Sequence, residues 1–309
     1  MEIPYVFINK RSIIPLNNKP YKKLIIGMGG SKGYLYLGIL HYLFTHYKEH
    51  IDLQYIDTFA GTSIGSIICL CLNIGLTPLQ ILQELLNIKF SFDININNIV
   101  KDFGLIDIGE LIKHLSQVII NKYNYIPTLY QLYKITGKTF ISNSYNLNTH
   151  NIVYFSYKTH PDILCTDVVS MSCNIPFLFK KILYKNEHYI DAGVVEPFLG
   201  NYILNNLSNN INSDNILGVY YKNININMNF IQYIHDICII PFMSRCKTTT
   251  NDKYNSLFIE INIKERILDT IADIGKVINN NNNKYKFEYF VKGILCMTKI
   301  RYKDKIKIE

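Results

Sequence analysis

Short apolar runs alternate with stretches of helical spacing along this chain. The apolar runs predict strands, at residues 23–30, 54–59, 138–142, 151–157, 188–191, 216–221 and 256–263. The stretches of helical spacing predict helices, at about 32–47, 66–73, 228–242, 265–278 and 285–298. Strands that alternate with helices indicate an α/β fold, in layers around a mainly parallel sheet.

Three further helix starts carry capping signals. Thr77 and Gln80 have the spacing of a capping box, and Pro78 takes the first helical position. Similar signals are found at Asp107 with Glu110, and at Thr128 with Gln131 ahead of a closing Gly137.

Composition fits a large globular core. The chain has 309 residues, of which 48% are hydrophobic. No run of about 20 unbroken apolar residues predicts a membrane span, and residues 1–20 lack the features of a signal peptide. The seven irregularly spaced cysteines favour reduced, buried thiols and a cytoplasmic location. Cys69 and Cys71 are interpreted as core residues, because no second pair lies at metal-site spacing.

The net charge of +8 is spread along the chain. Because no dense basic stripe or binding motif accompanies this charge, we expect no nucleic-acid partner. Attraction to an anionic lipid surface fits the charge, and an ordinary solvated basic surface fits it equally well.

The motif GTSIG at residues 61–65 places Ser63 between two glycines. Glycine and serine are common residues, so the pentapeptide alone is a weak signal. Its setting is more informative, because it joins a predicted strand to a buried apolar helix, which is the context of a nucleophile elbow. The positive end of that helix would stabilise negative charge on the serine oxygen. A serine in an ordinary tight turn is the alternative.

A second glycine-rich turn, GMGGSKG at residues 27–33, also joins a strand to a helix. It does not match the dinucleotide-binding fingerprint, because Lys32 stands where the third glycine would be. Free N–H groups at a helix start form an anion cradle, and a serine hydrolase needs such donors for its oxyanion. A tight strand–helix turn explains the glycines about equally well.

A nucleophilic serine needs a base. Three histidines follow Ser63 late enough for the usual order of serine, acid and histidine, and none lies in a motif: His160, His188 and His235. Asp191 ends a predicted strand ahead of a small-residue turn, a position where sheet enzymes place catalytic carboxylates. Such an aspartate could take the Ser63 proton directly.

Four blocks of the chain, taken in order, match the pattern of one family. They are GMGGSKGYLYLGIL at 27–40, GTSIG at 61–65, SCNIPFLF at 172–179 and Asp191-Ala192-Gly193. In these blocks the chain resembles the patatin-like phospholipases, over about residues 22–200. Each block alone is weak, and four blocks in the right order are specific.

The resemblance implies a patatin-like three-layer fold and a lipid acyl hydrolase of the phospholipase A type. It implies a dyad without a catalytic histidine, a metal or a cofactor. In this dyad Ser63 is the nucleophile that becomes acylated, and Asp191 is the general base. The implied oxyanion donors are the backbone N–H groups of Gly29, Gly30 and Ser31. The supporting motif residues are Gly27, Lys32, Gly33, Gly61, Gly65, Ala192 and Gly193.

The chain departs from the family pattern at four positions. Met28 stands where a first glycine is usual and could shift one oxyanion donor. Ala192 would be strained if its position requires a positive φ angle. Asn174 replaces a small alanine, and Glu196 stands where asparagine is common. None of these changes removes a catalytic group.

We expect an N-terminal segment at residues 1–21, a patatin-like catalytic domain at 22–225 and a C-terminal α/β extension at 226–309. The expected partner is a lipid substrate at a membrane surface, with peripheral contact to an anionic membrane. The sequence carries no signal for an oligomeric state.

Two other functions are compatible with the sequence. A histidine-dependent α/β-hydrolase esterase would use Ser63 with His188 or His235. A catalytically silent lipid-binding or interaction protein on the same fold would accommodate the departures at Met28 and Ala192.

Overall fold

A computed structural model describes residues 5–8, 13–14, 18–88, 102–206, 215–223, 256–263 and 283–306. The helices predicted at 228–242 and 265–278 lie outside these residues.

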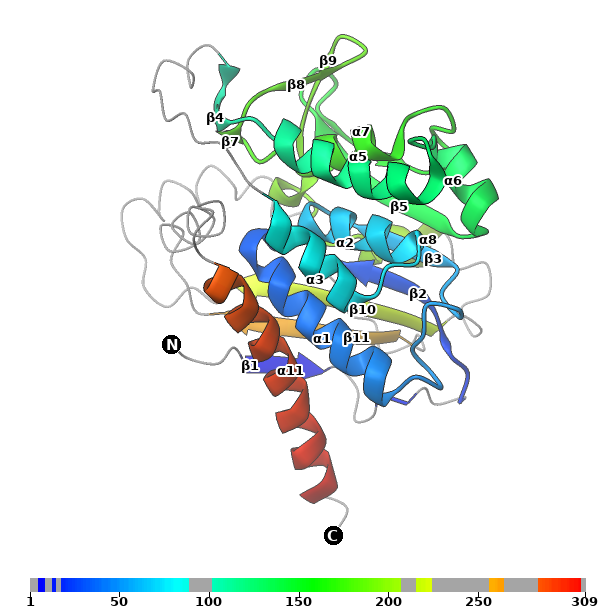
Figure 1. Ribbon diagram of the computed structural model, residues 1–309, viewed down its shortest axis with the longest axis vertical. Helices are drawn as coiled ribbons and strands as arrows, with labels where there is room; N and C mark the ends of the chain where they lie inside the picture. Colours follow the sequence, from blue (N-terminus) through cyan, green and yellow to red (C-terminus); the bar gives the residue numbers. More distant parts are fainter. Residues whose placement is uncertain are drawn as a thin grey trace.

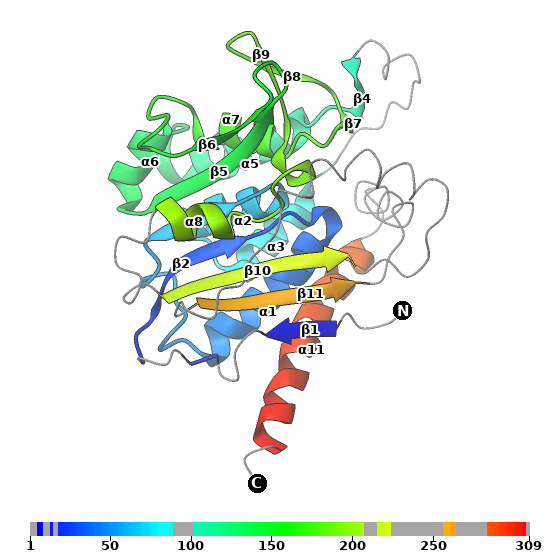
Figure 2. The same cartoon turned by 180° about the vertical axis from the view of Figure 1, so that it is seen from behind.

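A single large sheet forms the centre of the described structure (Figures 1 and 2). Its strand order is β1-β11-β10-β2-β3-β5-β9-β8, with β6 paired to β5. Its parallel strands are β11 (Ser256–Ile263), β10 (Asn215–Asn223), β2 (Tyr21–Ile26), β3 (Thr58–Gly61) and β5 (Thr139–Asn146). Antiparallel strands complete its edges: β1 (Tyr5–Ile8), β6 (Asn151–Phe155), β8 (Ile182–Tyr184) and β9 (Glu187–Asp191). The predicted mainly parallel α/β fold is confirmed.

Helices cover both faces of this sheet. One face carries α1 (Gly33–His46), α2 (Ile64–Asn73), α3 (Pro78–Asn87), α5 (Gly109–Tyr123), α7 (Cys165–Ser172) and α11 (Asn283–Ile306) (Figure 1). The short helix α8 (Gly200–Asn206) lies on the other face, in front of the sheet in Figure 2. Helix α6 (Leu129–Thr136) packs beside β5, and a small separate sheet pairs β4 (Gly104–Ile106) with β7 (Phe177–Phe179).

Two of the three capping signals act as predicted. The third does not, because the N-cap residue of α5 is Ile108 and the Asp107 carboxylate accepts from the Gly109 N–H at 2.7 Å. Both capping boxes form, at the starts of α3 and α6, and Gly137 ends α6 with a φ of 67°. The strand predicted at 54–59 starts only at Thr58. The Asp52 carboxylate and carbonyl accept from the N–H groups of Gln54 and Tyr55, and this turn keeps the preceding residues out of the strand.

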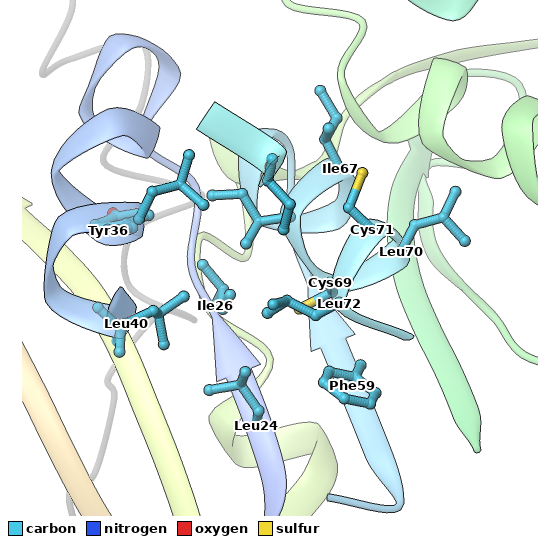
Figure 3. Packing of buried hydrophobic residues seen from close by; sticks show 14 of the residues in the cluster. Leu24, Ile26, Tyr36, Leu40, Phe59, Ile67, Cys69, Leu70, Cys71 and Leu72 are labelled. Carbon is cyan, nitrogen blue, oxygen red and sulfur yellow. The ribbon is translucent and has the colours of Figure 1, made fainter. Parts of the chain in front are cut away.

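The main core lies between the sheet and the α1–α2 layer. Figure 3 shows Leu24 and Ile26 of β2 and Phe59 of β3 facing the side chains of these helices. Cys69 and Cys71 are both buried thiols within this core, as interpreted from the sequence. Helix α2 is buried over nearly its whole length, which explains why its sequence is apolar on every side.

Helix α11 crosses α1 at backbone contact distance. A Cβ on Gly38 of α1 would lie 2.0 Å from the Phe290 carbonyl oxygen, and one on Gly293 of α11 would lie 2.3 Å from the Leu35 oxygen. The two glycines therefore allow the two helices to touch directly.

The sheet runs through all three segments expected from the sequence. Strand β1, from the expected N-terminal segment, pairs with β11, and β11 from the expected extension pairs with β10. Within the described ranges, no helix combines the length and the apolar character needed to cross a bilayer.

We predict that Gly293→Ala destabilises the protein by about 1–3 kcal/mol, because the added methyl group forces α1 and α11 apart. In an unobstructed helix the same change would stabilise, by about 0.5–1 kcal/mol. Urea unfolding measures the effect. Leu295→Ala is the control on the same helix, since Leu295 is 42% exposed. A stabilised Gly293→Ala protein would contradict the crossing.

Candidate active site

Ser63 occupies the sharp turn between β3 and α2. Its φ of 57° and ψ of −128° are unfavourable for a residue with a side chain. Such a conformation costs on the order of 1–3 kcal/mol and persists only where its surroundings enforce it. Ser63 is the N-cap residue of α2 without a side-chain cap hydrogen bond, so it lies at the positive end of a ten-residue helix.

Two glycines make this turn sterically possible. A Cβ on Gly61 would lie 2.2 Å from the carbonyl oxygen of Gly65. A Cβ on Gly65 would lie 2.3 Å from the carbonyl oxygen of Ile26, at the end of β2. The G-x-S-x-G spacing therefore reflects two backbone contacts, and it supports the predicted elbow geometry.

Hydrogen bonds from distant segments hold the turn. The N–H of Ser63 donates to the hydroxyl oxygen of Ser172 at 3.0 Å, and the Thr62 hydroxyl donates to Asn143 at 2.9 Å. Sequence reasoning gave neither Ser172 nor Asn143 a role. Ser172 opens the family block at 172–179, which is the signal that could have indicated it.

Asp191 lies at the end of β9, and the Ser63 side chain interacts with its carboxyl group. Its carboxylate also accepts from the N–H of Gly193 at 2.7 Å, and its own N–H donates to the Asn174 carbonyl at 2.8 Å. Both Ser63 and Asp191 are only 4% exposed. Burial raises the pKa of Asp191, and the interaction with Ser63 and the hydrogen bond from Gly193 offset part of this rise. The net result is a pKa of about 6. The structure thus brings together the two residues that the sequence paired.

The glycine-rich turn at 27–33 packs directly on the elbow. A Cβ on Gly33 would lie 2.3 Å from the Ile64 side chain. The hydroxyl of buried Tyr36 donates to the Met28 carbonyl at 2.6 Å and fixes the turn from below. Among the described residues, no carbonyl accepts from the N–H groups of Gly29, Gly30 or Ser31. These three donors are the ones expected from the sequence.

The two departures at Met28 and Ala192 are accommodated without strain. The Met28 N–H donates to the Pro197 carbonyl at 2.8 Å, so it does not serve as an oxyanion donor. Its side chain packs on Gly193, where a Cβ would lie 2.6 Å from the Met28 sulfur. Ala192 begins a short 3-10 helix, Ala192–Val194, and its φ angle is not positive.

The other two departures also have partners. The Asn174 side-chain amide donates to the Tyr189 carbonyl at 2.8 Å, which fixes the start of the turn that holds Asp191. The Glu196 carboxylate accepts from the Asn143 amide at 3.2 Å, and burial raises its pKa. Asn143 therefore links Glu196 to Thr62 of the elbow.

Lys32 is buried behind the glycine-rich turn. It is 1% exposed, and its Nζ lies 3.4 Å from the Ser31 hydroxyl and 5.8 Å from the centre of the Tyr289 ring of α11. The C-terminal helix therefore contacts the basic residue of the turn.

Histidines take no part in this arrangement in the described part of the chain. There, no histidine side chain is hydrogen-bonded to Ser63 or Asp191. His160 packs against the Phe155 ring, with ring centres 4.7 Å apart. His235 lies outside the described residues.

A family model described as patatin-like phospholipase matches residues 24–200. Probable lipid hydrolase 463L of Invertebrate iridescent virus 6 is 33% identical over 189 residues, which cover 59% of this chain and 63% of that protein. This match therefore spans less than two thirds of the viral relative. Uncharacterized protein R571 of Acanthamoeba polyphaga mimivirus is 24% identical over 301 residues, or 90% of this chain and 94% of that protein.

Two solved structures are also similar. VipD from Legionella pneumophila is 13% identical with a TM-score of 0.47, covering 94% of this chain and 70% of that one. The type III effector ExoU from Pseudomonas aeruginosa is 12% identical with a TM-score of 0.44, covering 92% of this chain and 53% of that one.

We predict that Ser63→Gly is more stable than Ser63→Ala by about 1 kcal/mol, because only glycine adopts this φ and ψ freely. Urea unfolding of both variants measures the difference. The matched control is the same pair of substitutions at exposed Gln83 in α3, where alanine is expected to be the more stable. A more stable alanine at position 63 would rule out strain at the elbow.

We predict that Asp191→Asn stabilises the protein above pH 6. Since the pKa of Asp191 is raised from 3.8 to about 6, the folded state binds more protons than the unfolded state between these values. The wild type therefore loses stability as the pH rises through this window, by up to about 3 kcal/mol.

Asparagine carries no charge, so the variant escapes this loss. Melting temperatures at pH 4.5, 6 and 8 test the prediction, and the advantage of the variant should shrink as the pH falls. Asp162→Asn, at an exposed aspartate, is the control. An advantage of equal size at all three pH values would contradict the predicted linkage.

Proposed function

Since the chain belongs to the patatin-like phospholipase family, we propose that it is a lipid acyl hydrolase of the phospholipase A type, acting through Ser63 and Asp191. The observation that carries the proposal is the pairing of a buried carboxyl group, Asp191, with the side chain of a serine on a strained turn, Ser63. The name of the viral relative, a probable lipid hydrolase, supports the same class of reaction.

In the proposed first half-reaction, the Ser63 oxygen attacks the carbonyl carbon of a fatty-acyl ester. Its proton passes to the Asp191 carboxylate. The negative charge that develops on the carbonyl oxygen is stabilised by the N–H groups of Gly29, Gly30 and Ser31 and by the positive end of α2. The intermediate then expels the alcohol, which takes the proton from Asp191 and leaves Ser63 acylated.

The second half-reaction uses the same groups for water. Asp191 accepts a proton from a water molecule, which attacks the acyl carbonyl. The fatty acid leaves, and the proton returns to the Ser63 oxygen. A base with a pKa of about 6 suits both directions, because it is ionised at neutral pH and its acid form readily gives the proton back.

The proposed substrate is a lipid presented at a membrane surface. The net charge of +8 would favour peripheral contact with anionic membranes on the cytoplasmic side. Because Met28 and Ala192 are packed without strain, these two departures give no physical reason for a silent site.

We predict that Ser63→Ala abolishes fatty-acid release and that Asp191→Asn lowers it by about 10²–10⁴-fold, the usual contribution of a general base. Purified proteins are incubated with vesicles of mixed lipids, and released fatty acids are identified by mass spectrometry. The wild-type kcat/KM is expected to rise with pH through about 6 as Asp191 ionises.

His188→Ala and His235→Ala are the matched controls, and both are expected to keep activity. Loss of turnover in a histidine variant, with turnover kept in Asp191→Asn, would replace the dyad with a histidine-dependent esterase. Failure of a fluorophosphonate probe to label Ser63 in folded wild-type protein would favour a silent lipid-binding protein.

A further inference from the structure

A cavity of about 360 Å³, lined mostly by residues of polar types, lies at the opposite end of the sheet from Ser63. Ser63 follows the carboxyl end of β3, whereas the cavity lies at the amino ends of β2, β3 and β5. It is large enough for a small organic ligand.

Three neighbouring parallel strands form the floor of the cavity. Their register places Lys23, Thr58 and Thr139 side by side in one row across the sheet. Side chains two residues further along each strand share this face, and they form an apolar row packed under α8: Ile25, Ala60 and Ile141. The face under α8 (Figure 2) thus changes from apolar to polar within two residues, and the cavity lies at the polar end.

Hydrogen bonds and a ring contact hold the walls of the cavity. The turn Ser156–Thr159 is closed by its own bonds, with the Thr159 hydroxyl donating to the Tyr154 carbonyl at 2.8 Å. Helix α8 supplies Tyr202 and Asn206, and the Tyr202 ring stacks on the Tyr154 ring at 3.9 Å. Both walls of the cavity are therefore tied to neighbouring parts of the fold.

The charges that line the cavity are positive. Lys23 lines it from the floor and is only 6% exposed. Lys158 lines it from the turn, and its ammonium lies 5.8 Å from the centre of the Tyr157 ring. Of the described residues that line it, none is acidic. The neighbouring carboxylate of Asp57 is exposed and accepts from the Thr58 hydroxyl at 2.8 Å.

We propose that this cavity binds the phosphate group of a small phosphate ester or of a lipid head group. Lysine binds phosphate as a point charge, and Lys23 and Lys158 are the charged residues among the described residues that line the cavity. The Thr139 hydroxyl adds a polar contact, and the Tyr202 ring offers an apolar surface to the rest of the ligand. The apolar row separates the cavity from Ser63, so this ligand is distinct from the ester that is cleaved.

Isothermal titration of the full-length protein with inorganic phosphate tests the proposal. We expect saturable binding that is weakened about tenfold or more by Lys158→Ala and by Lys23→Met, since each removes a charged hydrogen-bond donor. Lys185→Ala is the matched control for Lys158→Ala, because Lys158 and Lys185 are both exposed and each lies over the ring of the preceding tyrosine. The Lys158 ammonium is 5.8 Å from the centre of the Tyr157 ring, and the Lys185 ammonium is 5.5 Å from the centre of the Tyr184 ring. Ser63→Ala is expected to bind phosphate like the wild type.

Two additions keep the test decisive. If Lys23→Met fails to fold, two other variants still measure the contribution of the lining to phosphate binding. Lys158→Ala tests the wall of the cavity, and Thr139→Val tests its floor. Glycerol 3-phosphate, and phosphatidylcholine vesicles with and without phosphatidic acid, then compete with inorganic phosphate. Displacement by the soluble ester alone indicates a free phosphate ester, and displacement by the phosphatidic acid vesicles indicates a head group. Absence of saturable binding, or binding unchanged in both Lys158→Ala and Thr139→Val, would overturn the proposal.

Discussion

The close approach of α2 to the end of β2 at Gly65 is the contact on which the candidate site depends. A Cβ at Gly65 would lie 2.3 Å from the Ile26 carbonyl oxygen and 2.7 Å from that of Gly27. The Thr62 N–H donates to the same Ile26 oxygen at 3.2 Å. The serine turn therefore sits directly on the strand that carries the glycine-rich turn. One backbone contact sets the nucleophile and the candidate oxyanion donors relative to each other, which is the preorganisation that acyl transfer requires.

Two features of the site work against stability. Ser63 has a strained backbone, and Asp191 is a buried carboxylate whose pKa is raised to about 6. Both are held by groups outside the pair, since Ser172 fixes the Ser63 N–H and Asn174 fixes the Asp191 N–H. The buried α2 helix and the parallel strands beneath it supply the apolar packing that keeps this arrangement folded. Backbone strain and desolvation are thus concentrated at the two residues whose side chains exchange a proton in the proposed reaction.

Features set by local spacing were predictable from the sequence. The glycines at 61 and 65, both capping boxes and Asp191 at a strand end each depend on residues a few positions apart. Features set by distant pairs were not. Ser172 accepts from Ser63 across 109 residues of sequence, and Met28 packs on Gly193. The packing of α11 on α1 depends on Gly38 and Gly293, which have no periodic signal. Propensity favoured a strand from residue 54, and the Asp52 turn overrode it.

The support of the glycine-rich turn extends beyond the family match, which ends at residue 200. The Gly27 N–H donates to the Val219 carbonyl of β10 at 2.9 Å, and the Lys32 ammonium lies over the Tyr289 ring of α11. The turn is therefore held from one side by a strand and from the other by a helix that both follow the matched region. Because positioning of the donors by even a fraction of an ångström affects transition-state stabilisation, the residues after 200 belong to the physical description of this site.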